Sequence, residues 1–164
     1  MIKRIFCVLI ASVLMIFTNP FVLAEGVDNI PDGIPSLDPY YTDEYIIYPC
    51  ESTDRASYII DQTVSISSNT VGKITITLSF NTNATMQKLG FTALRVQHWN
   101  GSSWEDVWTK TDQYEYNTDY FSYVHTLSNM ASNDYYRVSV DLYAKKGFLQ
   151  VQTTTLVTNY IRCK

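Results

Sequence analysis

Apolar and polar residues alternate along most of the sequence after Tyr58, and this period of two restricts the fold more than any other feature. Successive side chains of a strand point to opposite faces, so alternation predicts strands with one buried face. In the clearest run, the two faces are Ile74, Ile76, Leu78 and Phe80 against Lys73, Thr75, Thr77 and Ser79. An earlier run predicts one buried face made of Tyr58, Ile60, Val64 and Ile66.

The alternating runs predict about seven strands with turn-forming residues between them. Their approximate ranges are 58–66, 73–80, 92–99, 104–109, 120–127, 136–144 and 149–161. No helical pattern is longer than a possible turn near 86–89, and no proline follows Cys50, as expected for a sheet. We therefore expect an all-β fold, an antiparallel β-sandwich, with a small closed barrel as the alternative.

Residues 1–24 have the pattern of a secretory signal peptide. Two basic residues precede an apolar run over 5–17, and the small residue Ala24 stands before Glu25. A charged start, an apolar stretch and a small-residue cleavage site follow one another in signal peptides. The alternative, a transmembrane anchor, needs about 20 apolar residues, and this run is shorter. We predict cleavage between Ala24 and Glu25, export, and one domain in the remaining 140 residues (164 minus 24).

The acidity of the exported chain is concentrated at its start. Eight acidic residues and no Lys or Arg lie between Glu25 and Asp54, whereas 55–164 has ten basic and eight acidic residues. Four of the five prolines also lie in the first part. We predict an acidic, extended leader over 25–49, whose aromatic end packs on a β-sandwich domain over 50–164. No basic cluster in the sequence indicates a nucleic acid or an anionic membrane as partner.

Two cysteines, Cys50 and Cys163, remain after cleavage of the signal peptide. An oxidising compartment outside the cell permits a disulfide between them. In the loop-entropy model, closing a loop of this length restricts the unfolded chain by about 4–5 kcal/mol. The alternative is a pair of free thiols, because connectivity is not readable from the sequence.

Three tryptophans surround one predicted hairpin. Trp99 precedes Asn100-Gly101, a pair suited to a tight two-residue turn, and Trp104 and Trp108 lie on the returning strand. Because Trp104 and Trp108 are an even number of positions apart, we expect them to share a face. Exposed aromatic rings stack on sugars and peptides, so the three tryptophans are a candidate binding surface. The alternative is cross-strand packing within the sheet.

The sequence shows no constellation of catalytic or metal-binding residues. His98 and His125 lie on separate predicted strands and can meet Asp119 or Glu115 only across a sheet. The adjacent pair Glu105-Asp106 points to opposite faces of a strand and cannot act together. There is no glycine-rich phosphate loop or nucleophile elbow. We therefore expect no enzymatic activity, no metal and no cofactor.

The C-terminal strands resemble those of fibronectin type III and immunoglobulin-like domains. The resemblance rests on the alternating run 130–144, on Gly147 and on the Thr-rich stretch 152–155. It implies that Tyr136 forms a tyrosine corner, in which the hydroxyl bonds back to the backbone a few residues upstream. The whole layout, from signal peptide through acidic leader to Tyr- and Thr-rich sandwich, resembles small secreted Gram-positive proteins classed as domains of unknown function.

These features lead us to expect a secreted, non-enzymatic binding or adhesion module whose ligand is an extracellular polymer or another protein. A structural protein that pairs its last strand or its leader with a larger assembly is the second possibility. A small hydrolase that uses His98 or His125 is the third. No sorting motif ends the sequence, so we expect release into the medium, with no nucleic acid partner and no membrane contact after signal cleavage.

Overall fold

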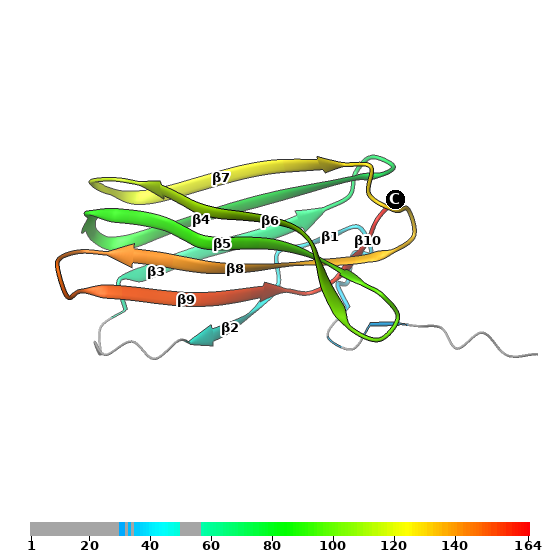
Figure 1. The fold of residues 1–164 in the computed structure, drawn as a ribbon, viewed down its shortest axis with the longest axis horizontal. Helices are drawn as coiled ribbons and strands as arrows, with labels where there is room; N and C mark the ends of the chain where they lie inside the picture. Colours follow the sequence, from blue (N-terminus) through cyan, green and yellow to red (C-terminus); the bar gives the residue numbers. More distant parts are fainter. Residues whose placement is uncertain (1–29, 32, 34, 50–56) are drawn as a thin grey trace, which may run out of the picture.

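The computed structural model describes residues 30–31, 33, 35–49 and 57–164, and it places strands but no helix in them. The strands form two antiparallel sheets that are not closed into a barrel, so the fold is a β-sandwich (Figure 1). The all-β sandwich prediction is confirmed, and the barrel alternative is wrong. Within the same residues, no helix is long and apolar enough to cross a membrane.

The smaller sheet has four strands and the larger sheet has six. The smaller sheet has the order β1 (Tyr41–Thr42), β3 (Ile59–Ser67), β4 (Lys73–Met86) and β7 (Thr118–Ser128). The larger sheet has the order β2 (Tyr45–Pro49), β9 (Val151–Thr158), β8 (Tyr135–Lys145), β5 (Lys88–Trp99) and β6 (Trp104–Glu115), with β10 (Ile161–Arg162) also on β8. The seven predicted strands correspond to β3 through β9. The possible helical turn near 86–89 is wrong, because only Gln87 separates β4 from β5.

The aromatic end of the predicted leader takes part in both sheets. β1 pairs with β3, and β2 pairs with β9 with Tyr45 opposite Thr158. The Glu44 carboxylate accepts a hydrogen bond from the Asn159 side chain at 2.7 Å, which fixes the connection between β1 and β2. Residues 41–49 therefore extend the sandwich instead of only covering it.

The core lies between the sheets and follows the alternation of the strands. On β4, the four apolar residues named above are buried, as predicted. Phe91 of β5 reaches across to β7, with its ring 5.9 Å from that of Phe121 and 5.2 Å from that of Tyr123, both edge-on. These contacts between rings of opposite sheets join the two layers into one core.

One buried position on β3 is predicted wrongly. The pairing of β3 with β4 shifts between Ile59 and Asp61, so one extra residue is inserted into β3. This bulge turns Ile59 into the core and leaves Ile60 56% exposed. A bulge reverses the faces of the residues beyond it, which a strict period of two does not anticipate.

The predicted last strand, 149–161, is interrupted. Val157 lies opposite Ser139, and Ile161 lies opposite Tyr136. The chain thus advances four residues from Val157 to Ile161 while β8 covers only three from Ser139 back to Tyr136. The interruption keeps Leu156 and Ile161 in the core although their spacing is odd. It also brings Tyr160 to the outer side, where its ring lies 5.6 Å from that of Tyr135.

Some predictions concern residues outside the described part of the chain. The signal peptide, its cleavage site between Ala24 and Glu25, and Cys50 all belong to this group. Cys163 is described, and its thiol is buried beside the Ser68 hydroxyl at 3.5 Å. The Cys50–Cys163 disulfide therefore remains a prediction.

Candidate ligand-binding site

The β5–β6 hairpin carries all three tryptophans, but its loop differs from the predicted turn. Four residues, 100–103, separate Trp99 from Trp104, and only Gly101 among them has a positive φ, 95°. The Asn100 side chain organises the loop, because its Oδ1 accepts hydrogen bonds from the Ser102 and Ser103 amides, both at 2.9 Å. The two-residue turn is therefore wrong, although Asn100 does supply the turn chemistry.

A bulge at Val107 separates the tryptophans. Trp108 lies opposite Val96, whereas Asp106 lies opposite Gln97, so Val107 is an extra residue on β6. Trp104 consequently faces the outside of the larger sheet, and Trp108 faces the smaller sheet. The prediction that Trp104 and Trp108 share a face is wrong, and the candidate surface divides into two parts.

The outer part is a cluster of Trp99, Trp104 and Tyr160, which we call the outer aromatic cluster. The rings of Trp99 and Trp104 lie 5.4 Å apart, and Tyr160 lies 6.1 Å from Trp104. The Arg137 guanidinium lies 4.4 Å from the Trp104 ring centre, and burial lowers the pKa of Arg137. Trp104 is thus covered by its own neighbours, and its indole N–H is buried without a hydrogen-bond partner.

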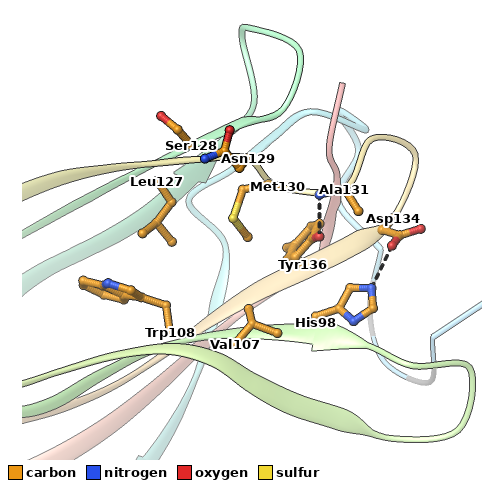
Figure 2. A pocket seen from close by; sticks show the side chains of 10 residues that line it. All are labelled: His98, Val107, Trp108, Leu127, Ser128, Asn129, Met130, Ala131, Asp134 and Tyr136. Atoms are coloured by element: carbon orange, nitrogen blue, oxygen red, sulfur yellow. Dashed lines mark hydrogen bonds and ion pairs between the residues drawn. The ribbon is translucent and has the colours of Figure 1, made fainter.

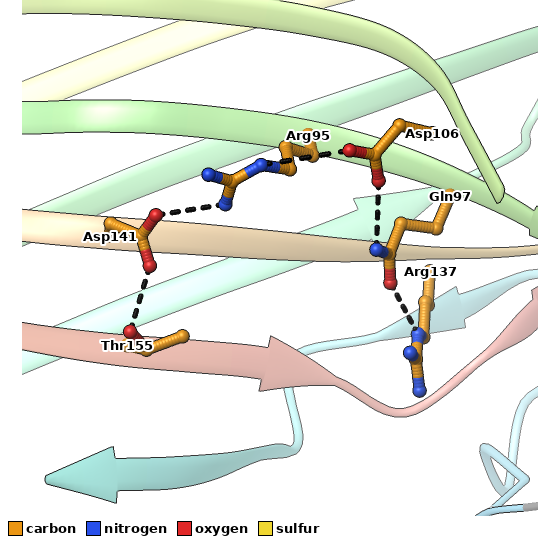
Figure 3. A network of polar contacts seen from close by, with 6 residues as sticks. All are labelled: Arg95, Gln97, Asp106, Arg137, Asp141 and Thr155. Atoms are coloured by element: carbon orange, nitrogen blue, oxygen red, sulfur yellow. Dashed lines mark hydrogen bonds and ion pairs between the residues drawn. The ribbon is translucent and has the colours of Figure 1, made fainter. Parts of the chain in front are cut away.

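Polar side chains beside this cluster are bonded to one another (Figure 3). Arg95 donates to Asp141 at 2.8 Å, and Thr155 donates to the other oxygen of Asp141 at 2.7 Å. Gln97 donates to Asp106 at 2.8 Å and accepts from Arg137 at 2.7 Å (Figure 3). Because these donors and acceptors satisfy each other, binding a ligand here requires breaking existing hydrogen bonds.

The inner part opens into a pocket of about 440 Å³ at one end of the sandwich (Figure 2). We call it the end pocket. The pocket lies where β6 approaches β7 and where residues 129–134 cross to the larger sheet. Five of its lining residues are apolar or carry an indole, Val107, Trp108, Leu127, Met130 and Ala131, and five carry polar groups, His98, Ser128, Asn129, Asp134 and Tyr136. Its volume lies within the range of small-ligand sites.

Backbone hydrogen bonds hold the wall of the end pocket in place. The Met130 amide donates to the Gly72 carbonyl at 3.0 Å, and the Asn133 amide donates to the Cys163 carbonyl at 2.8 Å. Both Asn129 and Asn133 have positive φ, 63° and 68°, a conformation that asparagine tolerates better than most residues. The connection is therefore held on both sides by backbone hydrogen bonds.

His98 and Asp134 form the polar centre of the pocket. His98 Nε2 lies 2.9 Å from Asp134 Oδ2, and both side chains are partly exposed (Figure 2). The partner of His98 is thus Asp134, and not Asp119 or Glu115, the two carboxylates that the sequence offered across a sheet. His125 does not join it, because its ring stacks on Trp108 at 4.7 Å.

Tyr136 closes the floor of the pocket. It is 3% exposed, and its hydroxyl accepts a hydrogen bond from the Ala131 amide, five residues upstream, at 3.1 Å. This is the geometry that a tyrosine corner requires. Burial raises the pKa of Tyr136, the Ala131 hydrogen bond opposes this, and Asp134 and Cys163 add to it. The hydroxyl is therefore protonated at neutral pH.

Replacing Tyr136 with phenylalanine should lower the free energy of unfolding by about 1–2 kcal/mol, because the Ala131 amide loses its acceptor while the ring stays in place. Urea unfolding of both proteins measures the difference. Tyr120 on the exposed side of β7 is the matched control, and Tyr120→Phe should change stability by less than about 0.5 kcal/mol. Equal midpoints for the Tyr136→Phe variant and the original protein would show that the corner hydrogen bond adds nothing.

Among the described residues, no group of three or more His, Cys, Asp or Glu side chains is placed to hold a metal ion. The chemistry available in the end pocket is thus that of one imidazole–carboxylate pair, one phenol, one aliphatic hydroxyl, one carboxamide and one indole beside apolar side chains. Such a set can hold a ligand that has an apolar face and several hydroxyl or amine groups.

No family model, no curated protein and no solved structure matches the chain.

Proposed function

We propose that the protein is a secreted, non-enzymatic binding module that holds a sugar unit of an extracellular polysaccharide in the end pocket. The observation that carries this proposal is that the Trp108 indole and the His98–Asp134 pair line the same pocket. Sugar rings have apolar faces that stack on aromatic rings, and their hydroxyls bond to carboxylates and imidazoles. Export is supported by the sequence of residues 1–24.

The end pocket is a better candidate than the outer aromatic cluster. Each tryptophan has a neighbour stacked on it, Arg137 on Trp104 and His125 on Trp108, so the polar groups decide between the two sites, and those beside Trp104 are bonded to each other. In the end pocket, Asp134 has one oxygen bonded to His98 and remains partly exposed. A ligand that reaches Asp134 therefore gains charge-assisted hydrogen bonds without first breaking a network of existing hydrogen bonds.

The experiment is a glycan array and a polysaccharide pull-down with the exported chain, repeated with Asp134→Asn and Trp108→Phe. Asp134→Asn keeps the size of the side chain but removes its charge, and we expect affinity to fall about tenfold or more. Trp108→Phe keeps an aromatic ring at this position but reduces the stacking area, and it should weaken binding as well. Trp104→Phe on the outer aromatic cluster is the matched control and should bind like the original protein.

Two results would contradict the proposal. Retention lost in Trp104→Phe but kept in Asp134→Asn would move the site to the outer aromatic cluster. Absence of glycan binding by the original protein would remove carbohydrate as the ligand class.

The same experiment distinguishes a binding module from a hydrolase. His98 and Asp134 have the geometry of a general base and the group that orients it. If the original protein releases sugar or peptide products and His98→Gln does not, the protein is a catalyst. If the original protein retains the glycan and releases no product, the binding module is supported.

A further inference from the structure

The turn between β8 and β9 exposes two large apolar side chains at its tip. Phe148 is 90% exposed and Leu149 is 84% exposed. The turn is closed by a hydrogen bond from the Lys146 amide to the Gln150 carbonyl at 3.0 Å. Both side chains therefore lie in water, outside the core. Apolar side chains that stay exposed at the tip of a turn do not stabilise the fold.

Three lysines lie at the base of this turn. Lys145 and Lys146 lie directly before it, and Lys88 of the neighbouring strand β5 is the cross-strand partner of Lys145. Like charges directly opposite in a sheet are unfavourable, so this pairing has a cost in the free protein. The Lys88 ammonium is held 3.6 Å from the centre of the Tyr114 ring, and that of Lys146 lies 5.6 Å from the centre of the Tyr58 ring.

The described carboxylates near this end of the molecule are on other strands or already paired. Asp141 of β8 is bonded to Arg95 and Thr155. Asp112 and Glu115 lie on β6, which β5 separates from β8, and Asp61 and Asp119 lie on β3 and β7 of the opposite sheet. The β8–β9 turn and the ends of its two strands, 145–151, contain two lysines and no acidic residue.

We propose that the β8–β9 turn docks on an anionic phospholipid surface, with Phe148 and Leu149 inserted among the acyl chains and Lys88, Lys145 and Lys146 against the headgroups. Charge complementarity selects this partner: each basic residue near an anionic bilayer contributes favourably, and apolar tips gain by leaving water. A convex two-residue tip also enters a fluid interface without the matching concave surface that a protein partner needs.

This inference uses residues distinct from the end pocket and does not depend on the proposed function. The expectation of no membrane contact came from the near-neutral charge of 55–164. The net charge of 55–164 is an average over the whole segment, and it does not show the local group of lysines that the fold brings together from β5 and β8.

The test is co-sedimentation of the exported chain with vesicles of phosphatidylcholine alone and of phosphatidylcholine mixed with phosphatidylglycerol. We expect binding to the anionic vesicles and weaker binding to the neutral ones. The double variant Phe148→Ser with Leu149→Ser should bind about 100-fold less tightly or worse. The variant Lys145→Gln with Lys146→Gln should lose on the order of 25-fold on anionic vesicles.

Leu149→Ser has a matched control in Leu37→Ser, because Leu37 is 94% exposed in the segment before β1. Only Leu149→Ser should weaken vesicle binding, and unchanged melting temperatures would show that both variants fold. Wild-type protein that stays in the supernatant with both vesicles would overturn the proposal, as would equal losses in the two leucine variants. Equal binding to neutral and anionic vesicles would overturn the role of the lysines. A dimer in sedimentation velocity that the Phe148, Leu149 variant abolishes, without vesicle binding, would assign the tip to a second copy instead.

Discussion

Replacing Gly90 with alanine should lower the free energy of unfolding by about 3 kcal/mol or more, the largest effect expected for a single methyl group in this protein. A Cβ at Gly90 would lie 2.0 Å from the carbonyl oxygen of Gln113 and 2.9 Å from the Cα of Tyr114, both backbone atoms of β6. The φ of Gly90, +156°, is also one that side chains with a Cβ rarely adopt. Alanine therefore forces β5 and β6 apart.

Urea unfolding measures the loss, and Gly147→Ala is the matched control. A Cβ at Gly147 would meet only the movable end of the Gln150 side chain, at 3.3 Å, so we expect a change below about 1 kcal/mol. If Gly90→Ala does not accumulate as folded protein while Gly147→Ala does, the expectation also holds. Equal unfolding midpoints for the two variants would contradict it.

Phe91→Ala should cost about 3–5 kcal/mol, because it removes a fully buried ring and leaves a cavity between the sheets. Phe91 is the residue of β5 whose ring contacts both Phe121 and Tyr123 of β7. Total stabilities of single domains are about 5–15 kcal/mol, so this loss is a large part of the whole. Thermal and urea unfolding by far-ultraviolet circular dichroism would report it.

The control for Phe91→Ala is Val124→Ala on the outer side of β7. Val124 is exposed, so its truncation should change stability by less than about 0.5 kcal/mol. Phe91→Leu should lie between the two, since leucine fills part of the space. A Phe91→Ala variant as stable as Val124→Ala would show that the two sheets do not depend on this contact.

The strands were predictable because burial of one face imposes a period of two on the residues themselves. β4 shows this most directly: its inward residues are apolar and its outward residues are Lys, Thr and Ser over the whole predicted run. The same pattern gave β8, where Val138 and Val140 are buried. Local side-chain chemistry determines these strands, so no information about distant residues is required.

The bulges were not predictable from the alternation. Ile60 and Val107 are β-branched residues in β-prone runs, and nothing in their neighbours marks them as extra. Each bulge is set by pairing with another strand, which reverses the face of every residue beyond it. This is why Trp104 and Trp108 were expected on one face and lie on two.

The end pocket was only partly predictable for a related reason. His98 was singled out for its chemistry, but Asp134 comes from the connection between β7 and β8, far from it in sequence. Its position depends on the Asn133–Cys163 hydrogen bond, which joins distant parts of the chain. No local signal in the sequence specifies such a contact.

The two proposals concern opposite ends of the molecule. β8 begins at Tyr135 beside the end pocket and ends at Lys145 beside the exposed turn, a separation of about 33 Å along the strand. A protein held on lipid by its β8–β9 turn would thus direct the end pocket away from the bilayer, toward the polymers outside it.

The pairing of β2 with β9 delays completion of the fold during synthesis. The Glu44–Asn159 hydrogen bond in this region joins residues 115 positions apart. Proteins rich in such non-local contacts fold in milliseconds to seconds, because loop-closure entropy is lost before the contacts form. The larger sheet cannot be completed until Thr158 has been made, so the native fold is reached only when almost the whole chain has been synthesised.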